Sequence, residues 1–188
     1  MTRPLLEIVI ASTRPRRIGL PVSDWIHERA LAHGTFAVEI VDLAAVDLPL
    51  MDEPNHPRLH QYTHQNTKDW SATIERADAF VFVMPEYNHG FNAPLKNALD
   101  YLHTEWAFKP IGFVSYGGPV GGTRATQMLK PVVLSLKMAP LMEAVSIPFV
   151  RRLLDEQQRL RSDETIEAAA ATMLDELARW TGALAPLR

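Results

Sequence analysis

Five apolar segments alternate with helical patterns along the chain, and this alternation constrains the fold more than any other feature. The segments are residues 5–11, 36–43, 79–84, 110–115 and 141–147. The first, third and fourth are almost continuously apolar, which is typical of strands covered on both faces. Because strands and helices alternate, the sequence predicts right-handed βαβ crossovers and a parallel sheet, an α/β fold.

Helical periodicity fills the gaps between these segments. One example is an i, i+3, i+4, i+7 stripe formed by Leu95, Ala98, Leu99 and Leu102. Residues 122–137 also have a helical pattern, although Pro131 should kink or split that helix. The last helix, residues 163–180, has one apolar face and is expected to end at Gly182.

Two strand orders are compatible with this alternation. They are the flavodoxin-like order 2-1-3-4-5 and half of a dinucleotide-binding fold. In both, ligands bind outside the carboxyl ends of the strands, where the strand order reverses. The loops after the first, third and fourth strands should therefore line one crevice.

Length and composition indicate a globular protein. The 188 residues fit one domain, residues 1–188, with 47% hydrophobic and 22% charged residues. A net charge of −3 gives no indication of a nucleic-acid partner. The absence of cysteine excludes disulfides, thiolate metal sites and cysteine nucleophiles, and it fits a cytoplasmic location. We expect no membrane segment, because no apolar run is long enough to span a bilayer.

The first crevice loop, residues 11–19, reads ASTRPRRIG. Ser12, Thr13 and the backbone N–H groups before Ile18 are placed to hold an anion at a helix N-terminus. Three arginines add forked donors suited to phosphate: Arg14, Arg16 and Arg17. Because neither GxGxxG nor GxxxxGK[ST] is present, a monophosphate is the more natural ligand. The alternative is a solvated basic turn with a serine or threonine cap.

The second loop reads PEYNHG and follows the third strand. Pro85 offers only a carbonyl, Tyr87 a flat face, and Asn88 both donors and acceptors. Such a set could hold the edge of a planar heterocycle, and Gly90 would permit an unusual turn. Alternatively, Asn88 is a turn residue, Asn92 caps the next helix, and Tyr87 only covers the end of the sheet.

The third loop, residues 115–122, reads SYGGPVGG. Its four glycines allow the main chain to approach a ligand closely or to adopt positive φ angles. The alternative is a flexible linker before the next helix. A crevice with a phosphate site at one end and a flat, amide-lined slot at the other describes a site for flavin mononucleotide (FMN).

Three stretches, ASTRPRRIG, MPEYNHGFNAPLKNALDYL and SYGGPVGGTRA, together resemble the NADPH-dependent FMN reductase family. The resemblance spans roughly residues 5 to 150. It implies a flavodoxin-like three-layer α/β/α sandwich with a five-stranded parallel sheet of order 2-1-3-4-5. Two departures stand out, because Ala11 and Arg16 lie where many relatives have glycine.

The resemblance also implies site residues, position by position. The FMN phosphate would be held by Ser12, Arg14, Arg17 and Gly19. The isoalloxazine ring and ribityl chain would meet Pro85, Glu86, Tyr87 and Asn88. The other side of the ring would be closed by Ser115, Tyr116, Gly117 and Gly118. No side chain is assigned as a general acid or base, and Glu86 is expected to be structural, paired with an arginine or lysine.

The implied activity is transfer of hydride from NADPH or NADH through FMN to a small acceptor. The acceptor could be a quinone, a free flavin, an azo compound or a metal oxyanion. Relatives are commonly dimers or tetramers, so we expect a homodimer or homotetramer with the flavin near the interface. An FMN-binding redox-sensing or interaction module with little turnover is the alternative. A hydrolase is less favoured, since no nucleophile elbow is present.

Three further signals carry weaker predictions. His56, His60 and His64 lie four residues apart, but no carboxylate completes a set at helical spacing, so we expect no metal site. These histidines belong to residues 49–65, the longest irregular stretch, which could act as a lid over a partner's flavin. Trp106 and Phe108 are expected to be exposed or to anchor an interface between subunits. Residues 151–161 are expected to form a solvated, charged connector.

Overall fold

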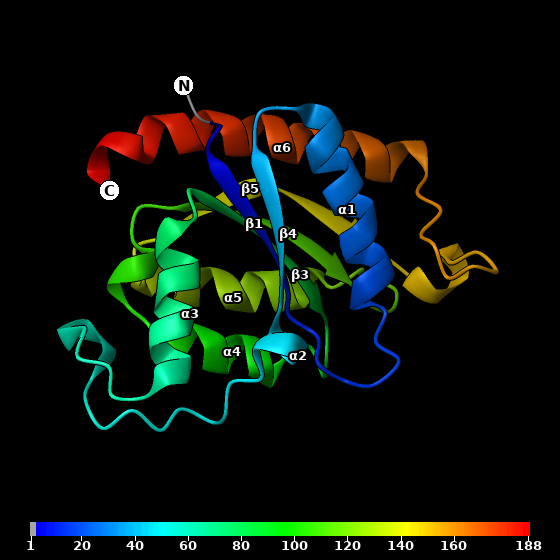
Figure 1. The fold of residues 1–188 in the computed structure, drawn as a ribbon. Coiled ribbons are helices and arrows are strands. Elements are labelled where there is room, and N and C mark those ends of the chain that lie inside the picture. The colour runs from blue at the N-terminus through cyan, green and yellow to red at the C-terminus, as the bar shows by residue number, and fades with distance from the viewer. Residues whose placement is uncertain (1–2) are drawn as a thin grey trace.

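A computed structural model describes residues 3–188 as a parallel five-stranded sheet between two layers of helices (Figure 1). The strands are β1 (Leu5–Ile10), β2 (Ala37–Asp42), β3 (Ala79–Pro85), β4 (Pro110–Tyr116) and β5 (Ala139–Ile147). Their order is β2-β1-β3-β4-β5, and every neighbouring pair is parallel. The predicted flavodoxin-like order is therefore confirmed.

The helices divide between the two faces of the sheet. One face carries α1 (Gly19–His33) and α6 (Glu164–Leu184), and the other carries α3 (Gln65–Arg76), α4 (Ala93–Asp100) and α5 (Thr123–Ser135). A short α2 (Leu43–Val46) follows β2. Single 3₁₀ turns lie at Pro57–Leu59, Thr104–Trp106, Val150–Leu153 and Ala185–Leu187.

Alternation along β3 shows why the sheet has a core on each side. Phe80 and Phe82 pack against α3, α4 and α5, whereas Val81 and Val83 pack against α1 and α6. All seven residues of β3 are buried. A strand buried on both faces must be apolar at every position, as the sequence indicated. This central strand fixes the loop that follows it at the carboxyl edge of the sheet.

Two expectations, about the end of the last helix and about Trp106, are wrong, and the expected split of a helix at Pro131 does not occur. Pro131 lies inside α5, and both Pro131 and Gln127, whose carbonyl loses its helical partner, are exposed to solvent. Helix α6 continues through Gly182 to Leu184. Trp106 is only 1% exposed, because its ring packs against Trp70, Phe80 and Phe82 in the core.

The irregular stretch between α2 and α3 is held against α4. Asn97 donates from Nδ2 to the carbonyl of Pro49 over 2.6 Å, and the amide of Met51 donates to Asn97 Oδ1 over 2.9 Å. His60 Nδ1 lies 3.3 Å from the buried carboxylate of Glu105. Within residues 3–188, no three side chains converge as a set of metal ligands. Over the same residues, no helix has the length and apolarity that crossing a bilayer requires.

Candidate active site

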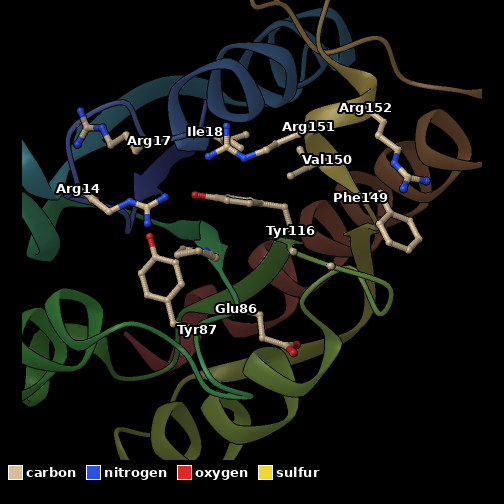
Figure 2. Close-up of a pocket in the computed structure, with 13 residues that line it drawn as sticks. Arg14, Arg17, Ile18, Glu86, Tyr87, Tyr116, Phe149, Val150, Arg151 and Arg152 are labelled. Atoms are coloured by element: carbon tan, nitrogen blue, oxygen red, sulfur yellow. The ribbon is translucent and has the colours of Figure 1, made fainter.

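A cavity of about 360 Å³ opens at the carboxyl edge of the sheet, where β1, β3, β4 and β5 end (Figure 2). Its volume falls in the usual range for small-molecule and cofactor sites. The three predicted loops all contribute to its wall. Of the twelve predicted site residues, eight line it: Arg14, Arg17, Pro85, Glu86, Tyr87, Tyr116, Gly117 and Gly118.

Ser12 and Gly19, two residues of the first loop that were expected to hold the phosphate, do not line the cavity and lie against each other. Ser12 is 1% exposed, and its Oγ has no hydrogen-bond partner among residues 3–188. A Cβ at Gly19 would overlap this oxygen and would lie 3.1 Å from the Tyr116 hydroxyl, so a larger residue here would have to displace the Ser12 side chain. Ile18, the N-cap of α1, makes no side-chain cap. The alternative of a serine or threonine cap is thus wrong, and the first N–H groups of α1 can bind an anion.

Arg14 and Arg17 have different surroundings. Arg17 donates from Nη1 to Asp42 Oδ1 and to the carbonyl of Ser12, both over 2.8 Å, and from Nη2 to Asp42 Oδ2. It ties the first loop to the end of β2. Arg14 is exposed and lies over the ring of Tyr87, 5.8 Å from its centroid. In Figure 2 Arg14 lies at the rim of the cavity, next to the Tyr87 hydroxyl.

The backbone conformation of Arg16 explains why many relatives have glycine at this position. Its φ angle is +56°, a left-handed conformation in which glycine has no steric penalty. The backbone here therefore has the shape that a glycine would allow. The arginine adopts it in an exposed turn.

The second loop forms a two-residue β-turn. The amide of Tyr87 donates to the carbonyl of Gly90 and the amide of Gly90 donates back, both over 2.9 Å. The central residues, Asn88 and His89, have φ angles of +50° and +69°, as a type I′ turn requires. The sequence predicts the unusual backbone angles at Gly90. In the structure they fall on Asn88 and His89 instead. Asn88 is exposed and does not line the cavity, which supports its reading as a turn residue.

Asn92 begins α4, but its side chain does not cap that helix. Instead its Nδ2 donates to the carbonyl of Ala11 over 2.6 Å, in a buried position. The amide of Ala11 in turn donates to the carbonyl of Val83 at the end of β3. Asn92 thus joins the first loop to the second, and this bond fixes the two walls of the cavity relative to each other.

Glu86 is neutralised by its neighbours. Its Oε1 accepts a 3.0 Å hydrogen bond from Arg124 Nη1, and its Oε2 accepts one from the Arg124 amide in the first turn of α5. A carboxylate at a helix N-terminus is stabilised by the helix dipole. The expected pairing with an arginine or lysine is confirmed.

The third loop uses its four glycines in two ways. Gly117 and Gly118 line the cavity, and a Cβ at Gly118 would meet nothing within 4 Å. Gly121 and Gly122 instead have φ angles of +59° and +88°. Ser115 points away from the cavity and donates to the carbonyl of Gly121 over 2.9 Å. Half of this loop therefore faces the cavity, and the other half turns the chain into α5.

Tyr116 is a buried aromatic side chain in the wall of the cavity. It extends across the space towards Arg14 and Ile18 (Figure 2). It is 5% exposed, and its hydroxyl has no hydrogen-bond partner within residues 3–188. Burial raises the pKa of Tyr116 to about 12, so the hydroxyl keeps its proton and can donate at neutral pH.

Five lining residues were not predicted. They are Ile18 and a run after β5: Phe149, Val150, Arg151 and Arg152. Arg152 stacks over the ring of Phe149, 4.6 Å from its centroid, at the cavity wall. The segment was expected to be a solvated connector. Because β5 is parallel to β4, residues that follow β5 must emerge at the same edge, and that topology was the signal that could have identified them.

Comparisons with known proteins agree with this architecture. A family model described as NADPH-dependent FMN reductase matches residues 5–151. An NAD(P)H-dependent FMN reductase of Schizosaccharomyces pombe is 42% identical over 149 residues, which cover 77% of this chain and 74% of that protein. A quinone reductase of Pseudomonas putida is 32% identical over 139 residues, covering 71% of each chain.

Solved structures share the fold at lower identity. FerB, a flavoenzyme NAD(P)H:(acceptor) oxidoreductase from Paracoccus denitrificans, superposes with a TM-score of 0.75 at 20% identity and covers 96% of this chain and 98% of that chain. This likeness supports the fold alone, whereas the family match and the yeast relative rest on sequence. The chain therefore belongs to the NADPH-dependent FMN reductase family.

Proposed function

We propose that this protein is an FMN-dependent NAD(P)H oxidoreductase whose cofactor binds in the cavity at the carboxyl edge of the sheet. The observation that carries the proposal is the first loop. There Ser12 Oγ is buried without a hydrogen-bond partner among residues 3–188, next to Gly19, the first residue of α1, and the N-terminus of that helix lacks a side-chain cap. A buried polar atom without a partner is costly, and a phosphate oxygen would satisfy it.

The donor set of the cavity fits FMN. The phosphate end has the guanidinium of Arg14 on the cavity wall and the N–H groups at the start of α1, which follows the lining residue Ile18. Ser12 Oγ is buried against Gly19 rather than on the wall, so it is an unsatisfied donor next to this end. The flat end has apolar and main-chain walls from Pro85, Gly117 and Gly118. A Cβ at Gly118 would face open space, so a planar ring can approach the backbone at that position.

When bound, FMN supplies the redox chemistry, accepting hydride from a reduced nicotinamide and passing electrons to an acceptor. The residues of this chain bind and orient it. Arg14 would neutralise phosphate charge, Arg17 holds the loop in place through Asp42, and the protonated Tyr116 hydroxyl is available as a donor to a bound ligand. Because the cofactor carries the redox chemistry, no protein side chain is needed as a general acid or base. Glu86, the carboxylate in the cavity wall, is ion-paired with Arg124.

The proposal extends to small acceptors, to one domain over residues 1–188, and to a cytoplasmic location. Relatives named as quinone reductases support the choice of a quinone as acceptor. A solved azoreductase with the same fold makes an azo compound worth testing as a second acceptor.

A homodimer or homotetramer with the flavin near the interface belongs to the same proposal. Exposed apolar side chains at the cavity rim support it. Tyr87 is 40% exposed and Met128 is 54% exposed, and Gly90, which pairs with Tyr87, lies next to Met128. Molar mass from light scattering during size-exclusion chromatography tests this part.

Anaerobic absorbance spectra of the purified protein test the activity. We expect a flavin spectrum, release of FMN rather than FAD on denaturation, and bleaching of the flavin bands by NADPH or NADH. A bound FMN that neither nicotinamide bleaches would instead indicate the redox-sensing module. A well-folded, colourless protein that refuses added FMN would refute the proposal.

A further inference from the structure

A second, larger hollow adjoins the cavity. It is a groove of about 1030 Å³ between α1 and the segment that follows β5. Arg17, Ile18 and Arg151 line both hollows, so the groove continues from the cavity. The groove is at the upper end of the sizes found for ligand sites. We call it the arginine groove, because five arginines line it: Arg16, Arg17, Arg29, Arg151 and Arg159.

Two of these arginines are already neutralised, and three are not. Arg17 is paired with Asp42, and Arg29 donates to Glu167 from Nε over 2.8 Å. Within residues 3–188, no carboxylate oxygen lies within 4 Å of a side-chain nitrogen of Arg16, Arg151 or Arg159. Two carboxylates also line the groove: Glu28 is paired with Arg29, and Asp24 has no ion-pair partner within residues 3–188. The three unpaired guanidinium groups therefore outnumber the one unpaired carboxylate, and the surface attracts anions, above all phosphates.

The turn that carries Arg159 is held in a fixed shape. Asp155 Oδ1 accepts hydrogen bonds from the amides of Gln157 and Arg159, over 3.0 Å and 2.8 Å. The amide of Asp155 donates to the carbonyl of Arg159 over 2.9 Å, and Leu154 pairs with Leu160 in an antiparallel bridge. The side chain of Arg159 is therefore presented by an ordered turn, which lowers the entropic cost of binding a ligand.

The other groups in the arginine groove suit a nucleoside. Leu20, Leu154 and Leu160 supply apolar surface for a base. Asp24, on α1, is an acceptor for ribose hydroxyls, whereas Glu28 Oε2 lies 3.4 Å from Arg29 Nη1. The groove thus offers apolar, acceptor and cationic surface around one hollow.

We propose that the arginine groove binds the adenosine-phosphate half of the nicotinamide dinucleotide and favours NADPH over NADH. This inference rests on the proposed function, in which the nicotinamide half enters the adjoining cavity. Arg151 is shared by the two hollows and faces the pyrophosphate that joins the halves. Arg16 and Arg159 line the groove but not the cavity, and they meet the 2′-phosphate that distinguishes NADPH. Arg159 is therefore a specificity-determining residue.

The test is a calorimetric titration of the FMN-loaded protein with two probes, adenosine 2′,5′-bisphosphate and 5′-AMP. We expect the bisphosphate to bind at least about 10-fold more tightly than 5′-AMP, because a charge-assisted hydrogen bond contributes that much. Arg159→Gln should remove most of this difference and should raise the KM for NADPH about 10-fold while changing the KM for NADH much less. Arg16→Gln should act in the same direction.

Arg179→Gln is the matched control. It removes the same charge from an exposed side chain on α6 that lines neither hollow. Equal affinity for the two probes, or an Arg159→Gln variant that equals the control, would overturn the inference even if FMN is bound and reduced. If instead the protein fails to bind FMN but retains the bisphosphate through Arg159, the proposed function fails and the groove assignment stands.

Discussion

Arg14 and Arg17 lie three positions apart in one loop, and their guanidinium groups have different neighbours. Arg17 donates hydrogen bonds to Asp42 and to the carbonyl of Ser12, so it stabilises the loop. Arg14 lies over the ring of Tyr87 and makes no side-chain hydrogen bond or ion pair within residues 3–188, so its donors are available to a ligand. The two arginines should therefore respond differently to substitution.

Replacing Arg14 with alanine should lower FMN affinity by about 1–3 kcal/mol, the range for a charge-assisted hydrogen bond to phosphate. Thermal stability of the protein without cofactor should stay within about 0.5 kcal/mol, because Arg14 is exposed. Fluorescence titration of FMN measures the affinity. Arg17→Ala is the contrasting variant, and it should lower the stability as well. An unchanged FMN affinity in Arg14→Ala would mean that the phosphate binds elsewhere.

Residue types in the loops could be predicted to face a ligand, but their individual orientations could not. The spacing of Ser12, Arg14 and Arg17 indicated an anion site, yet only the structure shows that Asp42 occupies Arg17. Asp42 lies 25 residues away, so no local pattern relates the pair. Asn88 illustrates the same limit, since a turn residue and a ligand residue have the same local sequence until the chain direction is known.

At the scale of elements, the loop between β4 and α5 depends on two glycines that do not face the cavity. Gly122 has a φ angle of +88°, and a Cβ there would lie 2.7 Å from Ser115 Cβ and 2.8 Å from the amide nitrogen of Tyr116. Both neighbours are fixed, because Ser115 and Tyr116 end the buried strand β4. Neither the backbone angle nor the space allows a side chain.

Gly122→Ala should therefore destabilise the protein by about 2–4 kcal/mol, from left-handed strain and overlap combined. The matched control is Gly182→Ala in α6, where a Cβ would meet nothing within 4 Å. That variant should stabilise the protein by about 0.5–1 kcal/mol, because alanine is the better helix former. Urea unfolding of the two variants measures both effects. Equal effects would show that Gly122 has no special conformation.

Element type and order followed from hydrophobic periodicity, whereas element ends did not. The strands on either side of each crossover are nearly as predicted, since a buried strand must be apolar throughout. The end of α6 was misjudged because glycine is a helix terminator only where the chain turns left-handed, and Gly182 does not. The burial of Trp106 was not predicted because its 3₁₀ turn packs against α3. The hydrophobic periodicity of the sequence does not reveal such a tertiary contact.

At the scale of the whole molecule, two buried ionisable groups contribute to the dependence of stability on pH above pH 4.5. Glu7, in the middle of β1, is fully buried, and neither carboxylate oxygen has a hydrogen-bond partner within residues 3–188. Arg76 Nη2 lies 3.7 Å from Glu7 Oε1. Burial raises the pKa of Glu7 to about 7, which outweighs the attraction of Arg76. Lys109 is buried too, and burial lowers its pKa to about 8.

The sign of each effect follows from proton uptake. Between pH 4.5 and 7 the folded protein keeps the Glu7 proton that the unfolded chain has lost, so stability falls as the pH rises through this window. Between pH 8 and 10.5 the unfolded chain keeps the Lys109 proton that the folded protein has lost, so stability rises with pH. The two groups together predict a minimum between pH 7 and 8.

Glu7→Gln should remove the first of these slopes. We expect the wild-type free energy of unfolding to fall by on the order of 2–3 kcal/mol between pH 5 and 7.5 through this group, and the variant to lose that fall. Urea unfolding at the two pH values measures the difference. A variant with the same pH dependence as the wild-type protein would show that Glu7 is not the group responsible.

The overall architecture was the most predictable level, because a parallel sheet leaves few topologies that satisfy right-handed crossovers. The position of the site at the carboxyl edge followed directly from that topology. The arginine groove did not follow from the sequence. It depends on the packing of the segment after β5 against α1, two parts of the chain separated by more than a hundred residues.

The central claim is that the first loop grips a phosphate, and its most direct test compares FMN with riboflavin, which lacks that group. Fluorescence titration of the cofactor-free protein measures both affinities under one set of conditions. FMN should bind about 100-fold or more tightly than riboflavin, because in the proposed complex the interactions of Arg14 and the start of α1 are made with the phosphate alone. Equal affinities for the two flavins, or no binding of either, would contradict the account.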